Sequence, residues 1–384
     1  MLFQANFPRN CKFGSKDSIG TQGANGLPRR DVLMLDGTQS QIRLRPKRAA
    51  SYLKTPIRWR PSIPTILSIV FSVELMTVLF VPDILKNRAF ILLVGLSIPI
   101  GGWLFVYWQI YLSVFTTPLR DFIDVKDERW KDVTFRGWGE EELIAKILSG
   151  SDISRDLVVY LHGYSSSLGR GESRCLHLNS LGPHIIGLDQ RGFGRQEGRF
   201  DWTILKAVAD AEALLEEVPK LLGFEPERVW IYGHSLGGFI TIRLASHPSD
   251  WWEHKLKGII LESPVTSFPK IIDEKLPGRM VMAKPWVRHT LRREYERIHP
   301  DLNVRYANSE LPYWGLPKVD YLLVQAEEDE TLGLDHYELA IKHLNPEDSY
   351  SSIHLVEGMV HTSTEDSAQR AELVENWLVP VLGE

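Results

Sequence analysis

From about residue 130 to the C-terminus, short runs of apolar and β-branched residues alternate with longer stretches of helical periodicity. Such runs predict strands, because four to eight consecutive apolar residues suit a strand that is buried on both faces. Six strands are expected, at residues 157–161, 184–188, 229–232, 258–261, 321–324 and 353–356. Strands that alternate with helices predict an α/β fold, with a mainly parallel sheet covered by helices on both faces.

Two stretches, one between predicted strands and one after the last of them, have the pattern of amphipathic helices. Between residues 202 and 218 the apolar side chains fall on one face at helical spacing, and Pro219 is the expected stop. A last helix is expected at residues 365–378.

Two longer apolar runs precede this region. Residues 61–82 contain one charged residue, Glu74, and residues 89–119 contain none. The second run exceeds the roughly 20 residues that span a bilayer, and aromatic residues gather towards its end as in an interfacial belt. We expect a membrane anchor at residues 61–115, with transmembrane helices at 63–84 and 90–112. The first is the weaker candidate, because a central carboxylate costs about 2 to 3.5 kcal/mol.

The number of spans decides the topology. Two spans form a hairpin that leaves both flanking regions on one side of the membrane, which the Lys and Arg distribution mildly favours. A single span places them on opposite sides.

Charge divides the chain further. Residues 1–60 carry twelve Lys or Arg against three acids, whereas residues 116–384 carry thirty against forty-four. The first segment is rich in Gly, Ser, Asn and Pro and is expected to be a disordered basic tail. Its last stretch lies next to the apolar run, which suggests attraction to anionic lipid. Cys11 and Cys175 are the only cysteines, so neither a disulfide framework nor a cysteine-based metal site is expected.

The most specific motif is G-x-S-x-G at residues 233–237, which follows an apolar strand and precedes a helix-compatible run. This is the context of a nucleophile elbow, where a tight strand-to-helix turn exposes a serine hydroxyl. Glycines flank Ser235 because larger side chains would collide with neighbouring backbone. Ser235 is therefore the predicted nucleophile.

A serine hydroxyl needs a base to accept its proton, and the base needs an acid to orient it. His361 follows the last predicted strand and lies near the chain end, so it is the predicted base. The acid is expected after the strand at 321–324, where several carboxylates follow Ala326. Asp329 is favoured because it stands three residues beyond this small residue, with Glu328 as the alternative.

The turn after the first parallel strand, His162-Gly163-Tyr164, is expected to face the nucleophile. The backbone N–H groups of Tyr164 and Leu236 are the predicted oxyanion hole. His162 is interpreted as a residue that stabilises the turn. Arg191, in the loop at residues 189–194, is expected to shape the same region.

Together these motifs resemble the α/β-hydrolase superfamily over residues 125–384. The resemblance is carried by Leu161-His162-Gly163, Asp189-Gln190-Arg191-Gly192, the motif around Ser235, Leu261-Glu262-Ser263-Pro264 and the pair Asp329 and His361. It extends to the membrane-anchored lipases of that superfamily, with departures such as Gln325, where a histidine is usual. It implies hydrolysis of monoacylglycerol or lysophospholipid, notably lysophosphatidylserine, at the endoplasmic reticulum. Hydrolysis through an acyl-enzyme needs no cofactor, and neither a metal nor a nucleic-acid partner is expected.

Between the strands at 258–261 and 321–324 lies an insertion, residues 265–318, that is long enough to form a cap. Between Lys270 and Arg297 it carries eight Lys or Arg against four acids, interleaved with apolar residues. It is either a packed cap with a solvated basic face, or a surface that meets anionic headgroups.

The motifs predict a serine ester hydrolase that works through an acyl-enzyme. Lipid esters lead as substrates, a protein or small-molecule thioester is the second candidate, and a catalytically silent membrane scaffold is the alternative from another class. The sequence leaves the oligomeric state and the side of the membrane open.

Overall fold

The computed structural model describes residues 72–73, 93, 95–97, 99–105, 116–118, 122–196, 202–275, 284–298, 305–344, 350–362 and 367–382. The tail predicted at residues 1–60 lies outside this set. So does most of the predicted anchor at residues 61–115.

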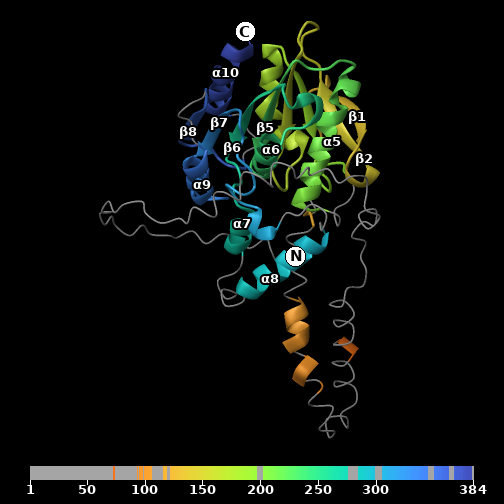
Figure 1. The fold of residues 1–384 in the computed structure, drawn as a ribbon, viewed down its shortest axis with the longest axis vertical. Coiled ribbons are helices and arrows are strands. Elements are labelled where there is room, and N and C mark those ends of the chain that lie inside the picture. Colours follow the sequence, from red (N-terminus) through yellow and green to blue (C-terminus); the bar gives the residue numbers. More distant parts are fainter. Residues whose placement is uncertain are drawn as a thin grey trace, which may run out of the picture. The chain divides into compact units, whose positions relative to one another are not determined.

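An eight-stranded sheet forms the centre of the described fold (Figure 1). Its strands are β1 (Lys131–Arg136), β2 (Glu142–Leu148), β3 (Asp156–Leu161), β4 (His184–Leu188), β5 (Arg228–His234), β6 (Leu256–Glu262), β7 (Asp320–Ala326) and β8 (Ser352–Val356). The order across the sheet is β1-β2-β4-β3-β5-β6-β7-β8. β2 is antiparallel to both of its neighbours, and all other pairs are parallel. The predicted α/β fold is confirmed.

The six predicted strands correspond to β3 through β8, whereas β1 and β2 were not predicted. β1 lies at the edge of the sheet and buries only Phe135, so it lacks the apolar run that marks a central strand. β2 buries more of its residues, but Lys146 interrupts its pattern and forms ion pairs with Asp124 and Asp132. Both strands pair in an antiparallel hairpin, which needs less apolar surface than a parallel strand covered on both faces.

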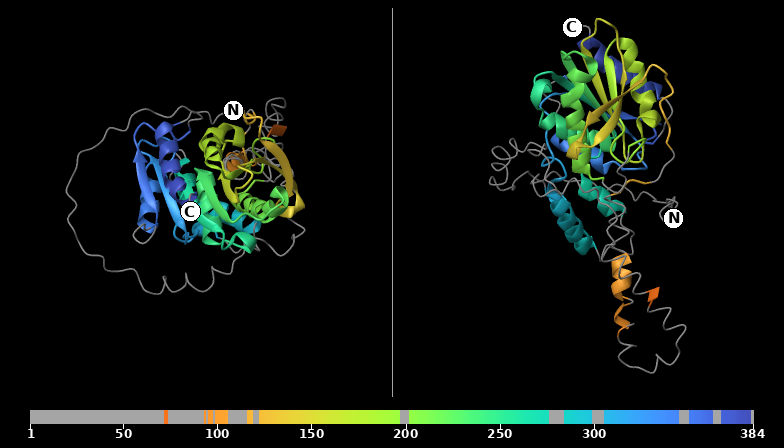
Figure 2. Two further views of the ribbon diagram at one scale, coloured as in Figure 1. Left: turned by 90° about the horizontal axis from the view of Figure 1, so that it is seen from above. Right: turned by 90° about the vertical axis from the view of Figure 1, so that its right-hand side faces the viewer.

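Helices cover both faces of the sheet (Figure 2). The described helices are α4 (Leu168–Cys175), α5 (Ile204–Leu222), α6 (Leu236–Ser246), α7 (Phe268–Lys275), α8 (Lys284–Ile298), α9 (Asp335–His343) and α10 (Ala368–Leu382), with short 3-10 turns at Trp138–Glu140, Leu176–Leu181, Asp250–Trp252 and Tyr306–Asn308. α7 and α8 lie beyond the end of the sheet and not on its faces (Figure 1). α5 and α6 pack in one buried cluster with the strands, and α4 and α10 pack in a second one.

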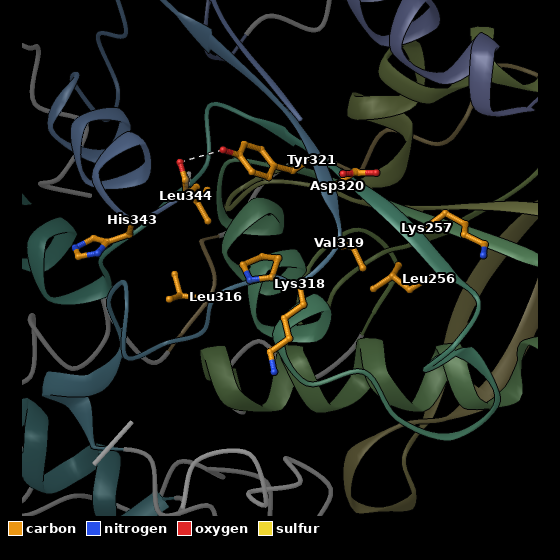
Figure 3. A pocket seen from close by; sticks show the side chains of 10 residues that line it. Leu256, Lys257, Leu316, Lys318, Val319, Asp320, Tyr321, His343 and Leu344 are labelled. Carbon is orange, nitrogen blue, oxygen red and sulfur yellow. Dashed lines mark hydrogen bonds between the residues drawn. The ribbon is translucent and has the colours of Figure 1, made fainter. Parts of the chain in front are cut away.

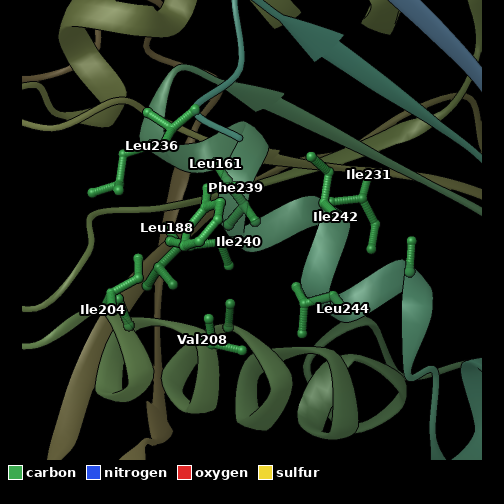
Figure 4. Close-up of a cluster of buried hydrophobic side chains, with 14 of the residues drawn as sticks. Leu161, Leu188, Ile204, Val208, Ile231, Leu236, Phe239, Ile240, Ile242 and Leu244 are labelled. Atoms are coloured by element: carbon green, nitrogen blue, oxygen red, sulfur yellow. The ribbon is translucent and has the colours of Figure 1, made fainter. Parts of the chain in front are cut away.

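The two clusters share strands because successive side chains point to opposite faces. In β3, Leu157, Val159 and Leu161 belong to the cluster with α5 and α6, whereas Val158 and Tyr160 belong to the other. Figure 4 shows the first cluster, where α5 and α6 meet the sheet beside the nucleophile elbow. Packing on both faces therefore holds the carboxyl end of β5 in place.

The predicted end of the long helix at Pro219 is wrong, because α5 continues to Leu222 and ends at Gly223 in the left-handed conformation. Pro219 has no N–H to donate to the carbonyl of Leu215. The indole Nε1 of Trp251 donates to that oxygen instead, at 2.8 Å. A tertiary contact thus compensates for the proline. The last helix likewise continues past the predicted end at residue 378, because α10 runs through Pro380.

The predicted transmembrane segments are only partly described. Residues 72–73 of the first and residues 93, 95–97 and 99–105 of the second are helical. Large apolar side chains are exposed there, including Leu96, Ile100 and Phe105. Among the described residues, no helix combines the length and apolar character that crossing a bilayer requires.

The insertion between β6 and β7 contains α7, α8 and a 3-10 turn. α8 buries Val287, Leu291 and Tyr295, which are spaced four residues apart and so share one helix face. The exposed Arg293 lies on the opposite side, whereas the exposed Arg288 lies beside the buried face and forms an ion pair with Asp273 of α7.

Candidate active site

Ser235 stands between the end of β5 and the start of α6, in a strained backbone conformation with φ 52° and ψ −115°. A Cβ atom at Gly237 would collide with the carbonyl group of Leu161, and one at Gly233 would collide with the carbonyl of Gly237. The glycines of the motif are therefore required by close backbone approach. The strained turn presents the Ser235 side chain at the carboxyl edge of the sheet.

Backbone hydrogen bonds fix this turn to the next strand. The N–H of Ser235 donates to the carbonyl of Glu262 at 2.9 Å, and the N–H of Val265 donates to the carbonyl of Ser235 at 3.0 Å. The nucleophile elbow is thus held between β6 and the start of the insertion.

The structure brings Ser235, His361 and Asp329 together, although they come from three loops. Nε2 of His361 lies 2.9 Å from Oγ of Ser235, and Nδ1 of His361 lies 2.7 Å from Oδ2 of Asp329. A carboxylate oxygen only accepts, so Nδ1 of the neutral imidazole donates to Asp329. This tautomer leaves the Nε2 lone pair available to accept the hydroxyl proton of Ser235.

Asp329 is held from several sides. Its Oδ1 accepts the N–H groups of Thr331 and Leu332, both at 2.9 Å, and its Oδ2 also accepts Nε2 of Gln325 at 3.0 Å. Burial alone would raise the pKa of the Asp329 carboxyl, but the hydrogen bond from His361 and the backbone donors lower it below its usual value. Asp329 is therefore an anion when His361 is neutral. Glu328, the alternative acid, is exposed.

The predicted oxyanion turn passes close to the nucleophile. A Cβ atom at Gly163 would lie 3.1 Å from Cβ of Ser235, so the backbone of this turn runs against the serine. Leu236 is the first residue of α6, where an N–H has no acceptor within the helix. The Tyr164 side chain donates to the carbonyl of Thr116 at 2.8 Å and packs against Phe193. The oxyanion role of the Tyr164 and Leu236 N–H groups stays a prediction.

His162 is buried in the turn and both of its ring nitrogens meet backbone groups. Nδ1 donates to the carbonyl of Gly163 at 2.7 Å, and Nε2 accepts the N–H of Gln190 at 3.0 Å. Burial lowers the pKa of His162, so the ring is neutral. These contacts agree with the interpretation of His162 as a residue that stabilises the turn.

Arg191 is buried too and ties the loop at residues 189–194 to other elements. Its guanidinium pairs with Asp210 of α5 and donates to the carbonyl of Trp138 at 3.0 Å. It joins the loop to α5 and the hairpin and does not take part in the triad contacts.

A buried charged cluster behind His361 was not predicted. Glu262, the last residue of β6, forms an ion pair with Arg174 of α4 at 2.9 Å and lies 3.8 Å from Arg370 of α10. The three residues come from separate elements, and no spacing in the sequence relates them. The one available signal was the charge of Glu262 at the end of a strand that is otherwise apolar.

A pocket of about 400 Å³ lies elsewhere, between β6, β7 and the end of α9 (Figure 3). Leu256 and Asp320, which begin β6 and β7, line it together with Lys318 and His343. β5, β6 and β7 are parallel, so this pocket is at the amino edge of the sheet and Ser235 at the carboxyl edge. It is therefore separate from the triad. Within the described residues, no group of three or more His, Cys, Asp or Glu is arranged to hold a metal ion.

Comparison with known protein families finds one family model that matches part of the region that forms the sheet. The family model described as "Serine aminopeptidase, S33", of the Hydrolase_4 family, matches residues 152–331. The matched segment contains Ser235 and Asp329, and it ends before His361.

Curated relatives include lysophosphatidylserine lipases named ABHD12. The zebrafish (Danio rerio) protein is 32% identical over 116 residues, which are 30% of this chain and 29% of the relative. The Xenopus tropicalis protein is 31% identical over 144 residues, or 37% of this chain and 33% of the relative. The chain thus spans about a third of the length of the curated relatives it matches.

Among solved structures, the Pyrococcus furiosus esterase Pf2001 superposes with a TM-score of 0.49 at 17% identity, covering 70% of this chain and 97% of that one. The family model and the curated relatives confirm the predicted resemblance.

Proposed function

We propose that this chain is a serine ester hydrolase of the α/β-hydrolase type that cleaves lipid acyl esters through Ser235, His361 and Asp329. The observation that carries the proposal is the continuous hydrogen-bond chain from Ser235 Oγ through His361 to Asp329. Nucleophile, base and acid in this order are the parts that acyl transfer needs.

The chemistry follows from the tautomer of His361. Nε2 accepts the proton of Ser235 as Oγ attacks the carbonyl carbon, and the imidazolium is stabilised by the Asp329 anion. The tetrahedral oxyanion is placed against the N–H groups of Leu236 and Tyr164. His361 then returns the proton to the leaving alcohol. Water, activated by the same base, releases the fatty acid from the acyl-enzyme.

The lipid substrate is inferred from the relatives and from the predicted anchor. We propose monoacylglycerol or a lysophospholipid, with lysophosphatidylserine as the first one to test, because the curated relatives carry that substrate in their names. A protein or small-molecule thioester is the second candidate, since the same triad cleaves both bonds. A scaffold without turnover is disfavoured because His361 lies within hydrogen-bond distance of both Ser235 and Asp329.

Membrane association is the remaining part of the proposal. Exposed apolar side chains in residues 93–105 and the basic outer face of α8 support it. The rings of Trp103 and Trp286 lie 5.0 Å apart, which connects the apolar helix with α8. Aromatic and basic side chains in this arrangement suit an interface with anionic headgroups. The endoplasmic reticulum is the proposed membrane, on the resemblance alone.

Purified full-length protein in vesicles tests the substrate. We expect release of fatty acid from lysophosphatidylserine or monoacylglycerol, and no release by Ser235→Ala. Activity on a short thioester with none on either lipid would favour the second candidate.

A further inference from the structure

The base His361 lies in an exposed loop that has few buried side chains. After β8 the chain exposes Glu357, Gly358, Val360 and Thr362, and buries Met359 and His361. Contacts with the His361 side chain fix the ring, but they do not fix the backbone that carries it. The carbonyl oxygen of His361 accepts two side-chain donors, Nε2 of His234 at 2.9 Å and Nη2 of Arg174 at 3.4 Å.

His234 is the residue between Gly233 and the nucleophile. A carbonyl oxygen only accepts, so Nε2 of His234 carries the proton that it donates to His361. Burial lowers the pKa of His234 well below its usual value, and the charge of Arg174 lowers it further. The ring is therefore neutral. One side chain thus connects the nucleophile elbow to the backbone of the base, and the rings of His234 and His361 lie 5.1 Å apart.

Arg174 donates to the same carbonyl and is itself held by Glu262. Its Nε donates to Oε1 of Glu262 at 2.9 Å, and the hydroxyl of Tyr232 donates to Oε2 at 2.6 Å. Burial alone would raise the pKa of Glu262, but its charged neighbours, chiefly Arg174, lower it to about 2. Glu262 is therefore an anion, and its charge holds the guanidinium beside His361.

We propose that His234 and Arg174 are positioning residues for the base, with Glu262 holding Arg174. They fix the backbone of His361 so that Nε2 stays 2.9 Å from Ser235 Oγ, while Asp329 fixes the rotation of the ring. The variable residue of this G-x-S-x-G motif then has a defined task, which is to donate to the base's own carbonyl. This inference rests on the proposed function.

The predicted consequence is kinetic. When the base is displaced by about 1 Å, the catalytic rate falls on the order of a hundredfold. Such a displacement affects proton transfer with Ser235 and leaves substrate binding unaffected. Loss of the His234 donor should therefore lower kcat and leave KM unchanged.

His234→Leu removes the donor, and His234→Gln keeps an amide N–H near the position of Nε2. On a soluble short-chain ester, we expect His234→Leu to lower kcat about tenfold to a hundredfold with KM within about twofold. His234→Gln should recover most of that loss. Arg174→Met should lower kcat in the same way.

His184→Leu is the matched control. His184 is also buried, and its Nε2 donates to the carbonyl of Ser154 at 3.2 Å, at the opposite edge of the sheet. The His184→Leu substitution should lower Tm and leave the kcat of the folded protein unchanged. Equal effects of His234→Leu and His184→Leu on kcat would overturn the proposal, as would a His234→Leu variant with wild-type kcat.

A second readout does not depend on turnover. The Nδ1 proton of His361, held by Asp329, should give a downfield NMR signal that His234→Leu broadens or shifts and His234→Gln preserves. If the wild-type protein is inactive but its NMR signal responds to the two His234 variants in this way, the proposed function is refuted and the positioning role is supported. A signal that His234→Leu leaves unchanged would refute the positioning role, whatever the activity.

Discussion

Nδ1 of His361 and Oδ2 of Asp329 lie 2.7 Å apart, and both side chains are buried. The neighbouring carboxylates Glu327, Glu328 and Glu330 are all exposed. Of the four acids that follow Ala326, only Asp329 forms a hydrogen bond with His361 in the described part of the chain. This hydrogen bond favours Asp329 over Glu328, the two acids between which the sequence did not decide.

Asp329→Asn should lower kcat about 10⁴-fold, because an amide donor facing Nδ1 favours the wrong tautomer of the base. Glu328→Gln is the matched control and should keep kcat within about twofold, since its side chain is exposed. Steady-state hydrolysis of a soluble ester measures both. The opposite ranking would make Glu328 the acid.

Glu262 should make the stability of the fold depend on pH below neutrality. Its pKa is lowered in the folded state from 4.5 to about 2, so its contribution is present above about pH 4.5 and is lost as pH falls towards 2. That contribution is on the order of 3 kcal/mol.

Urea unfolding of Glu262→Gln from pH 4.5 to 2.5 should therefore show a flatter pH dependence than the wild type, besides a lower stability at pH 7 because Arg174 loses its buried partner. Glu327→Gln, at an exposed position, should follow the wild type. Parallel curves for Glu262→Gln and the wild type would exclude this account of the cluster.

Gly237→Ala should destabilise the elbow, because its Cβ would collide with the carbonyl group of Leu161. We expect a loss of about 1 to 3 kcal/mol in the free energy of unfolding, together with lower kcat as Ser235 shifts. Gly102→Ala is the control, since nothing lies within 4 Å of its Cβ position. Wild-type stability and activity of Gly237→Ala would contradict the close approach.

The basic face of α8 should respond to anionic lipid. In full-length protein in phosphatidylcholine vesicles, adding phosphatidylserine should slow hydrogen exchange of the α8 amides. Arg293→Gln should raise the phosphatidylserine content needed for half of this protection by about fivefold, since each charge contributes about 1 kcal/mol. Lys220→Gln, on the exposed side of α5, should change nothing. If hydrogen exchange of the α8 amides does not change with phosphatidylserine content, α8 is not a membrane interface.

The central fold was predictable because its parallel strands are buried on both faces and therefore appear as continuous apolar runs. The hairpin β1-β2 was not, since an edge strand such as Lys131–Arg136 needs few apolar residues. The full length of α5 was not predicted, because it depends on a tertiary contact. Trp251, outside the helix, supplies the donor that Pro219 lacks.

The candidate site also has a part that could be predicted from the sequence and a part that could not. That Ser235, His361 and Asp329 meet in the fold was predictable, because the order of such residues along the chain and the turn chemistry are local signals. The cluster of Arg174, Glu262 and Arg370 depends on three elements that meet only in the folded state. In a sequence, a single buried charge looks the same as a solvated one.

The central claim is that Ser235 is a nucleophile activated by His361. A fluorophosphonate probe on the full-length protein, followed by mass mapping of the labelled peptide, tests it most directly. We expect one phosphonylated residue, Ser235, labelling that is slowed by orders of magnitude in His361→Ala, and none in Ser235→Ala. Labelling that persists undiminished in Ser235→Ala would contradict the account.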